Sequence, residues 1–134
     1  MIKLRQRLSN QEGFTLIELL IVIVIIGILL AIAVPSYLGF KTRANKRAAQ
    51  SNLREAIPTA EAFYSDAGTY VGLTHTSMVA IDSGLDKNVT VVTATTGGYC
   101  LTDSVGGQAW AVGGPGASWY KAANCSGTAV SVNA

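Results

Sequence analysis

The residue most suggestive of chemistry in this sequence is a lone carboxylate, Glu18, at the edge of a long apolar run. Leu19–Phe40, directly after it, are twenty-two residues without a charged side chain. A charge at the centre of a membrane helix costs about 2.5–3.5 kcal/mol on insertion scales, so such a residue normally marks a function. The alternative is an interfacial charge whose side chain reaches back to the lipid headgroups. The position of Glu18 near the start of the run is compatible with both.

The other polar residues offer no recognisable catalytic or ligand-binding arrangement. The sequence contains no nucleophile–base pairing, phosphate-binding loop or dinucleotide fingerprint. Its one histidine, His75, is distant from Cys100 and Cys125, and the spacing fits no zinc pattern. Three aspartates lack EF-hand spacing and are better explained as turn formers: Asp82, Asp86 and Asp103. We therefore expect no enzyme activity, no cofactor and no metal site.

A membrane-spanning element follows from the composition. The 134 residues are 49% hydrophobic and 13% charged, and that charged fraction is about half of the roughly 25% usual in soluble domains. This balance excludes a basic protein that coats nucleic acid and a disordered charged tail. At about 1.5 Å per residue, the apolar run extends roughly 33 Å as a helix, enough to cross a hydrocarbon core of about 30 Å. Because the rest of the chain is too small to surround such a helix, we predict a membrane-spanning segment.

A polar segment precedes the apolar run, and an amphipathic segment follows it. Residues 1–13 carry three basic residues, as a secretory signal does, but the apolar run exceeds the core of about 7–15 residues found in such signals. Any cleavage should therefore remove only a leader peptide, residues 1–13. Beyond the run, apolar and charged residues keep a helical spacing up to the stop signal Gly68. We expect one helix over about 14–66, with a membrane-spanning part at 14–40 and an amphipathic half at 41–66.

Short strands separated by glycine turns are expected in the remaining residues, 67–134. A small antiparallel meander of this kind needs a covering layer, and the amphipathic half of the helix is the only candidate. The predicted fold class is therefore α+β, with one long helix packed on a small antiparallel sheet in a Gly-rich head domain. The expected strands are Val89–Thr95, Tyr99–Thr102, Ala109–Val112 and Ser118–Lys121, with a turn at Gly113–Gly116.

The segment Gly13-Phe14-Thr15-Leu16-Ile17-Glu18, with the apolar run that continues to Tyr37, resembles the amino-terminal signature of the type IV pilin family. This family includes the pseudopilins of type II secretion. The resemblance implies the type IV pilin fold and cleavage between Gly13 and Phe14 by a membrane-embedded prepilin peptidase. It also implies N-methylation of the new Phe14 amine.

Assembly roles are implied in the same way for three residues of the helix. In the family, the glutamate that matches Glu18 pairs with the amine of a neighbouring subunit's first residue, here Phe14. Cleavage creates that positive charge, and a carboxylate in apolar surroundings needs such a partner. The positions that match Gly27 and Pro35 bound a stretch of helix that loosens on assembly, since proline lacks an N–H and glycine lowers helix propensity. A mild kink tolerated in a membrane helix is the alternative for these two residues.

The cysteine pair is the other feature that the resemblance explains. Members of the family often carry a disulfide in their carboxy-terminal region. Two cysteines in an exported domain likewise favour a Cys100–Cys125 disulfide. Such a bond would stabilise the head domain by about 3–4 kcal/mol in the chain-entropy account.

A basic cluster directly after the apolar run leaves the choice of its partner open. Lys41, Arg43, Lys46 and Arg47 are suited to anionic headgroups, to DNA, or to acidic residues of adjacent subunits. A solvated helix face that binds no partner is the remaining alternative. Pairing between subunits is favoured, and DNA is possible but not indicated. The acidic residues considered as partners are Glu55, Glu61 and Asp66.

We therefore expect a structural subunit, a pilin, of a type IV pilus-like filament that serves adhesion, motility or DNA uptake. Its expected partners are further copies of itself in a helical filament, the prepilin peptidase/methylase, the pilus assembly platform with its ATPase, and the inner (cytoplasmic) membrane. The precursor would cross that membrane once with its amino terminus inside, and the assembled pilus would lie at the cell surface. The alternative is the major pseudopilin of a type II secretion system. A membrane-anchored binding module that never polymerises would need neither cleavage nor Glu18.

Overall fold

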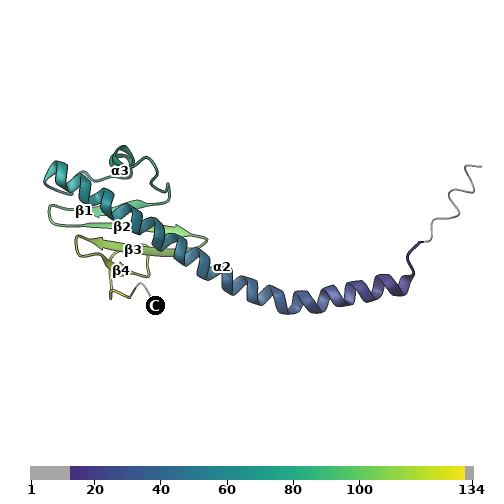
Figure 1. Ribbon diagram of the computed structural model, residues 1–134. Coiled ribbons are helices and arrows are strands. Elements are labelled where there is room, and N and C mark those ends of the chain that lie inside the picture. The colour runs from purple at the N-terminus through teal and green to yellow at the C-terminus, as the bar shows by residue number, and fades with distance from the viewer. Residues whose placement is uncertain (1–12, 132–134) are drawn as a thin grey trace, which may run out of the picture. The chain divides into compact units, whose positions relative to one another are not determined.

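A computed structural model describes residues 13–131 of the chain. Residues 1–12 of the predicted leader therefore lie outside the described part. The chain divides into two units, one ending at Gly39 and the other beginning at Phe40, and the helix α2 runs through both. The α+β fold expected from the sequence is confirmed, with one long helix and a small antiparallel sheet (Figure 1).

The long helix α2 extends over Leu16–Ala67. Its first part is the one segment among the described residues that is long and apolar enough to cross a membrane, with a mean hydropathy of 3.3 over its most apolar stretch. Every residue from Phe14 to Phe40 is exposed. The helix ends where the sequence indicates, because Gly68 adopts φ +69° and its N–H donates to the carbonyl of Tyr64 at 2.7 Å.

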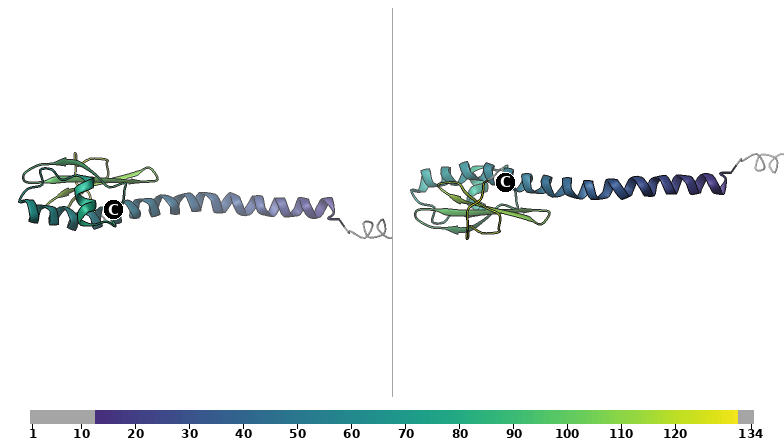
Figure 2. Two further views of the ribbon diagram at one scale, coloured as in Figure 1. Left: turned by 90° about the horizontal axis from the view of Figure 1, so that it is seen from above. Right: turned by 90° about the horizontal axis from the view of Figure 1, so that it is seen from below.

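In the second unit, α2 packs on one face of a four-stranded antiparallel sheet of order β1-β2-β3-β4 (Figures 1 and 2). The confirmed meander joins β2 to β3 by the two-residue turn Gly106-Gly107, and both glycines have the positive φ that this kind of hairpin turn requires. The strands are β1 (Thr90–Ala94), β2 (Tyr99–Val105), β3 (Gln108–Gly114) and β4 (Ser118–Tyr120).

The buried face of α2 is built largely from alanine. Ala49, Leu53, Ala56 and Ala60 recur every three or four residues and are each fully buried. Their small side chains let the helix approach the sheet, which contributes its own core residues, chiefly Leu101, Trp110 and Val112. Two cations of α2 lie over tryptophan rings of the sheet, Lys46 at 5.1 Å from the Trp110 centroid and Arg54 at 5.8 Å from that of Trp119.

The expected turn at Gly113–Gly116 is wrong in its first half. Gly113 and Gly114 belong to β3, where they pair with Cys100 and Tyr99. A side chain at Gly114 would collide with the ring of Tyr99, so glycine is needed there for close packing. The turn itself begins at Pro115.

A short helix, α3 (His75–Ile81), was not foreseen from the sequence. It begins with a capping box, in which Ser77 N–H donates to Thr74 Oγ1 at 3.1 Å and Thr74 N–H donates to Ser77 Oγ at 2.9 Å. Only Met78 is fully buried in it, so its periodicity is too weak to detect over seven residues.

Candidate functional site

The amino-terminal end of α2 is built around a reciprocal pair of hydrogen-bonded residues, Thr15 and Glu18. The backbone N–H and the hydroxyl of Thr15 both donate to Oε2 of Glu18 at 2.8 Å, and the N–H of Glu18 donates to Oγ1 of Thr15 at 3.2 Å. This arrangement is a capping box, which satisfies helix-end donors that would otherwise lack partners. The carboxylate considered for assembly therefore already has a partner within its own chain.

Thr15 is a site residue that the sequence reasoning missed. The signal was present, because a Thr-x-x-Glu spacing directly before an apolar run is typical of a helix start. Glu18 therefore combines an unfavourable charge near an apolar segment with a local capping role. Thr15 holds one carboxylate oxygen, Oε2, and leaves Oε1 without a bond to the described chain.

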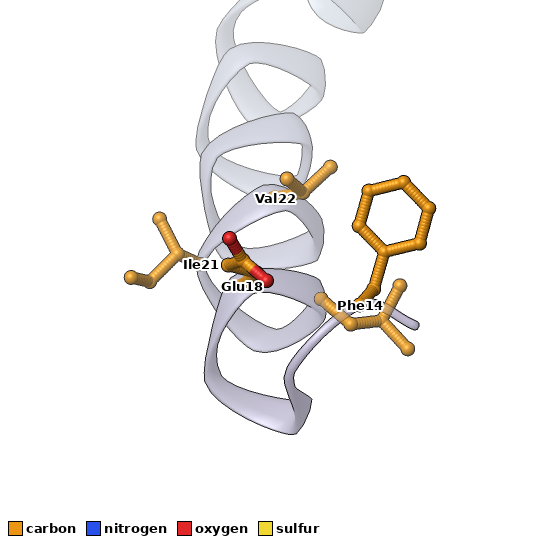
Figure 3. Close-up of a pocket in the computed structure, with 5 residues that line it drawn as sticks. Phe14, Glu18, Ile21 and Val22 are labelled. Carbon is orange, nitrogen blue, oxygen red and sulfur yellow. The ribbon is translucent and has the colours of Figure 1, made fainter. Parts of the chain in front are cut away.

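Apolar side chains surround the Glu18 carboxylate on the outside of the helix. Phe14, Leu19, Ile21 and Val22 line a shallow hollow together with Glu18, and the carboxylate lies among them (Figure 3). Phe14 is 94% exposed, so its ring is uncovered in the single chain. A hydrophobic surface of this kind, with one acceptor in it, is suited to an apolar partner that also carries a positive charge.

The other predicted residues of this segment are placed by α2 but not brought together. Gly13 precedes the helix, and Gly27 and Pro35 stand within it eight residues apart. A side chain added at Gly13 or Gly27 would meet no atom within 4 Å. Packing within the described chain therefore does not explain either glycine.

A second group of polar side chains fastens the far end of α2. Glu61 accepts hydrogen bonds from two tyrosine hydroxyls, from Tyr70 at 2.8 Å and from Tyr99 at 3.1 Å. Burial, followed by the neighbouring Glu61 carboxylate, raises the pKa of Tyr70 to about 12 and that of Tyr99 well above its ordinary value. Glu61 is therefore engaged inside the head domain, which corrects its assignment as a candidate partner for another subunit.

A buried carboxylate links the middle of the amphipathic half of α2 to the sheet. Asp103 of β2 is 1% exposed and accepts from Asn52 Nδ2 of α2 at 2.9 Å. Burial raises the pKa of Asp103, while the bonds from Asn52 and from the N–H of Ser104 oppose that effect. The hydrogen bond from Asn52 therefore joins the helix to the sheet at a buried position.

The two cysteines form the expected disulfide. Cys100 of β2 is bonded to Cys125, with 5.9 Å between the two Cα atoms. The segment after β4 is held further by a hydrogen bond from Val130 N–H to the Trp119 carbonyl at 2.8 Å. Among residues 13–131, no group of three or more His, Cys, Asp or Glu side chains is placed to hold a metal ion.

Comparison with known proteins identifies relatives over most of the chain. Residues 8–34 match the prokaryotic N-terminal methylation motif. The chain is 37% identical over 120 residues to the type IV wide pilus major component of Thermus thermophilus, covering 85% of this chain and 89% of that protein. It is 45% identical over 61 residues to the type IV major pilin protein of Myxococcus xanthus, covering 46% of this chain and 28% of that protein.

A third relative belongs to a secretion system. The chain is 49% identical over 45 residues to the type II secretion system core protein G of Escherichia coli, which covers 34% of this chain and 31% of that protein. This similarity is therefore local, whereas the similarity to the Thermus thermophilus protein includes the greater part of both chains.

Proposed function

Because the chain belongs to the type IV pilin family, we propose that it is the structural subunit of a type IV pilus-like filament. The observation that carries this proposal is the uncovered apolar helix, in which every side chain from Phe14 to Phe40 is exposed. An apolar surface of this extent needs lipid or other protein around it. The helix first anchors the subunit in the cytoplasmic membrane and then packs against copies of itself in the filament.

Proteolytic processing of the amino terminus precedes the packing of the helix in the filament. We infer that prepilin peptidase cleaves after Gly13 and that the amine of Phe14 is methylated, which fits the match of residues 8–34 to the N-terminal methylation motif. The released amine is a cation beside an apolar ring, which is the kind of partner that the hollow around Glu18 suits. Residues 1–13 are then a leader, and the head domain from residue 67 onward forms the exterior of the filament.

The test is mass spectrometry of the protein from its native host. Filaments sheared from the cell surface should yield a mature chain that begins at N-methylated Phe14. A chain that retains residue 1 and stays in the membrane fraction would contradict the proposal and favour a membrane-anchored binding module.

The role of Glu18 has its own test. Glu18→Ala should leave cleavage at Gly13 intact and strongly reduce filament assembly, because the incoming amine then enters the apolar interior without a counter-charge. Glu18→Asp serves as the matched control, since it keeps the charge. Normal filaments from Glu18→Ala would exclude this role.

We infer in addition that the helix loosens between Gly27 and Pro35 during assembly. The structure of the single chain keeps this stretch helical, and the absence of an N–H at Pro35 lowers the cost of opening it. Hydrogen exchange should be faster there in filaments than in the detergent-solubilised precursor. Equal protection in both states would count against loosening.

The major pseudopilin of a type II secretion system is the second candidate, and the local identity to the Escherichia coli protein favours keeping it. The two candidates differ in what the cell loses. Deletion of the gene should abolish surface filaments while secretion of folded proteins continues. The reverse result would favour the pseudopilin.

A further inference from the structure

The outward face of the amphipathic half of α2 carries its charges in two separate rows. Arg43, Arg47 and Arg54 fall within about 40° of one another around the helix axis at about 100° per residue. Glu55 and Asp66 fall within about 20° of each other, and Glu55 lies about 120° around the axis from Arg43. We call the first row the arginine edge and the second the acidic edge; all five residues are exposed.

These two edges border the side of α2 that the sheet leaves open. The buried residues Ala49, Leu53, Ala56 and Ala60 lie about 220–280° around the axis from Arg43, so they occupy the opposite side. Figure 2 shows the sheet along one side of this part of the helix. The charged edges are therefore available to a neighbouring molecule.

Four residues of the two edges lack an ion-pair partner in the described part of the chain. Within residues 13–131, neither Arg43 nor Arg54 has a carboxylate partner, and Glu55 and Asp66 have no cationic partner. Arg54 is nevertheless oriented, because its guanidinium lies 5.8 Å from the centroid of the Trp119 ring. Unpaired charges of both signs on one helix face indicate a partner that carries both signs as well.

The spacing of the charges is the same on both edges. Arg54 follows Arg43 by eleven residues, and Asp66 follows Glu55 by eleven residues. If the arginine edge of one helix faces the acidic edge of a parallel copy without an axial shift, only Arg54 lies level with a carboxylate, that of Glu55, and Arg43 and Asp66 stay unpaired. A shift of about twelve residues, or about 18 Å, instead brings both arginines level with both carboxylates at once.

We propose that the partner is a second copy of this chain, shifted by this amount along the helix axis. Arg43 and Arg54 of one subunit pair with Glu55 and Asp66 of its neighbour, so that the arginine edge of each subunit meets the acidic edge of the next. Because the two edges are about 120° apart, the contact joins different faces of the two copies and repeats along an open assembly. The inference rests on the proposed filament function and adds a specific contact and axial shift to it.

Other partners explain only half of the pattern. An anionic membrane surface or a nucleic acid would bind the arginine edge but would be repelled by the acidic edge. Neither would require an equal spacing of eleven residues on both edges. A second copy of the chain accounts for both signs and for the matched spacing.

Charge reversal in the native host tests the pairing. Arg43 and Glu55 are the pair to change, because neither side chain packs in the core of the head domain. Arg43→Glu alone and Glu55→Arg alone should each lower the yield of sheared filaments by about fivefold or more, the effect of losing a favourable exposed pair at every contact. The two changes together should restore the yield. Lys41→Glu is the matched control, since it makes the same charge change about 160° around the axis from Arg43 and should have little effect.

The outcomes separate this inference from the filament function itself. If wild-type cells yield no filaments of this chain, the proposed function itself is contradicted. Filaments that survive both single reversals, or a double reversal that restores nothing, would overturn the pairing and leave the subunit role intact. A loss from Arg43→Glu but not from Glu55→Arg would identify a lipid phosphate or a nucleic acid as the partner instead.

A second measurement does not depend on the yield of reversed-charge variants. Arg43→Lys keeps the positive charge and supplies a primary amine, which a carbodiimide joins directly to a carboxylate in contact with it. Treated filaments of this variant should give a cross-linked peptide that joins position 43 to Glu55 of another copy. Intact filaments that yield no such peptide would overturn the pairing.

Discussion

Replacing Glu61 by alanine removes the one acceptor that two buried tyrosine hydroxyls share. Tyr70 and Tyr99 are 2% and 4% exposed, and their hydroxyls donate to the two oxygens of this carboxylate. A buried donor left without a partner costs about 1–3 kcal/mol, so two such donors predict a loss of about 2–6 kcal/mol. That loss is a large fraction of the stability of a small domain.

The assay is urea unfolding of the detergent-solubilised full-length chain. Trp110 and Trp119 are 1% and 8% exposed and both lie in the core, so their fluorescence reports the packing of α2 on the sheet. Glu61→Gln should cost less than Glu61→Ala, because the amide keeps an acceptor and its NH2 can donate to the second hydroxyl. Glu55→Ala is the matched control on the exposed face, and its effect should stay within about 0.5 kcal/mol.

Removal of the two hydroxyls supplies the decisive comparison. If the cost arises from unsatisfied donors, Tyr70→Phe and Tyr99→Phe should recover stability in the Glu61→Ala background and lose it in the wild type. Additive effects of the three changes would refute the reasoning. A loss below about 0.5 kcal/mol for Glu61→Ala would refute it as well.

Three further predictions concern other parts of the chain. Cys100→Ser with Cys125→Ser should lower the free energy of unfolding by about 3.5 kcal/mol, measured by urea unfolding, and an equal midpoint would contradict the chain-entropy account. Burial raises the pKa of Asp103 from its ordinary value of 3.8, so the folded chain holds that proton more tightly and loses stability as the pH rises through the folded pKa. The free energy of unfolding of Asp103→Asn, relative to that of the wild type, should therefore increase from acidic to neutral pH, as measured by urea unfolding at several pH values. If the difference between the two proteins does not change with pH, titration of Asp103 does not contribute to stability. Thr15→Val should reduce filament yield while Thr15→Ser preserves it, because only the hydroxyl bonds to Glu18; equal yields would show that the capping hydroxyl is dispensable.

Much of the fold was predictable because its strongest signals are local. The apolar run, the stop at Gly68 and the glycine turn between β2 and β3 each depend on residues close together in the sequence. Their backbone preferences hold regardless of what packs against them. The helix bounds accordingly differ from expectation by about two residues, the usual uncertainty of helix ends.

The buried face of α2 was predicted less well. Apolar residues at helical spacing differ in their burial, since Leu53 is fully buried, Ala48 and Ile57 are partly buried, and Ala44 is exposed. Alanine gives almost no hydrophobic signal, and the buried side also includes polar residues such as Gln50. Which side of an alanine-rich helix is covered is decided by the sheet it meets.

The sequence by itself determined the membrane-compatible helix, the meander and the family, since all three follow from the order and spacing of neighbouring residues. Only the tertiary structure decided that Glu61 serves Tyr70 and Tyr99, because Tyr99 is thirty-eight residues away and reaches Glu61 only after β2 has taken its register. It also left the arginine and acidic edges of α2 free of ion pairs within the described chain. A charge on a helix becomes available to another subunit only when the fold leaves it unpaired. Long-range packing determines which charges stay unpaired.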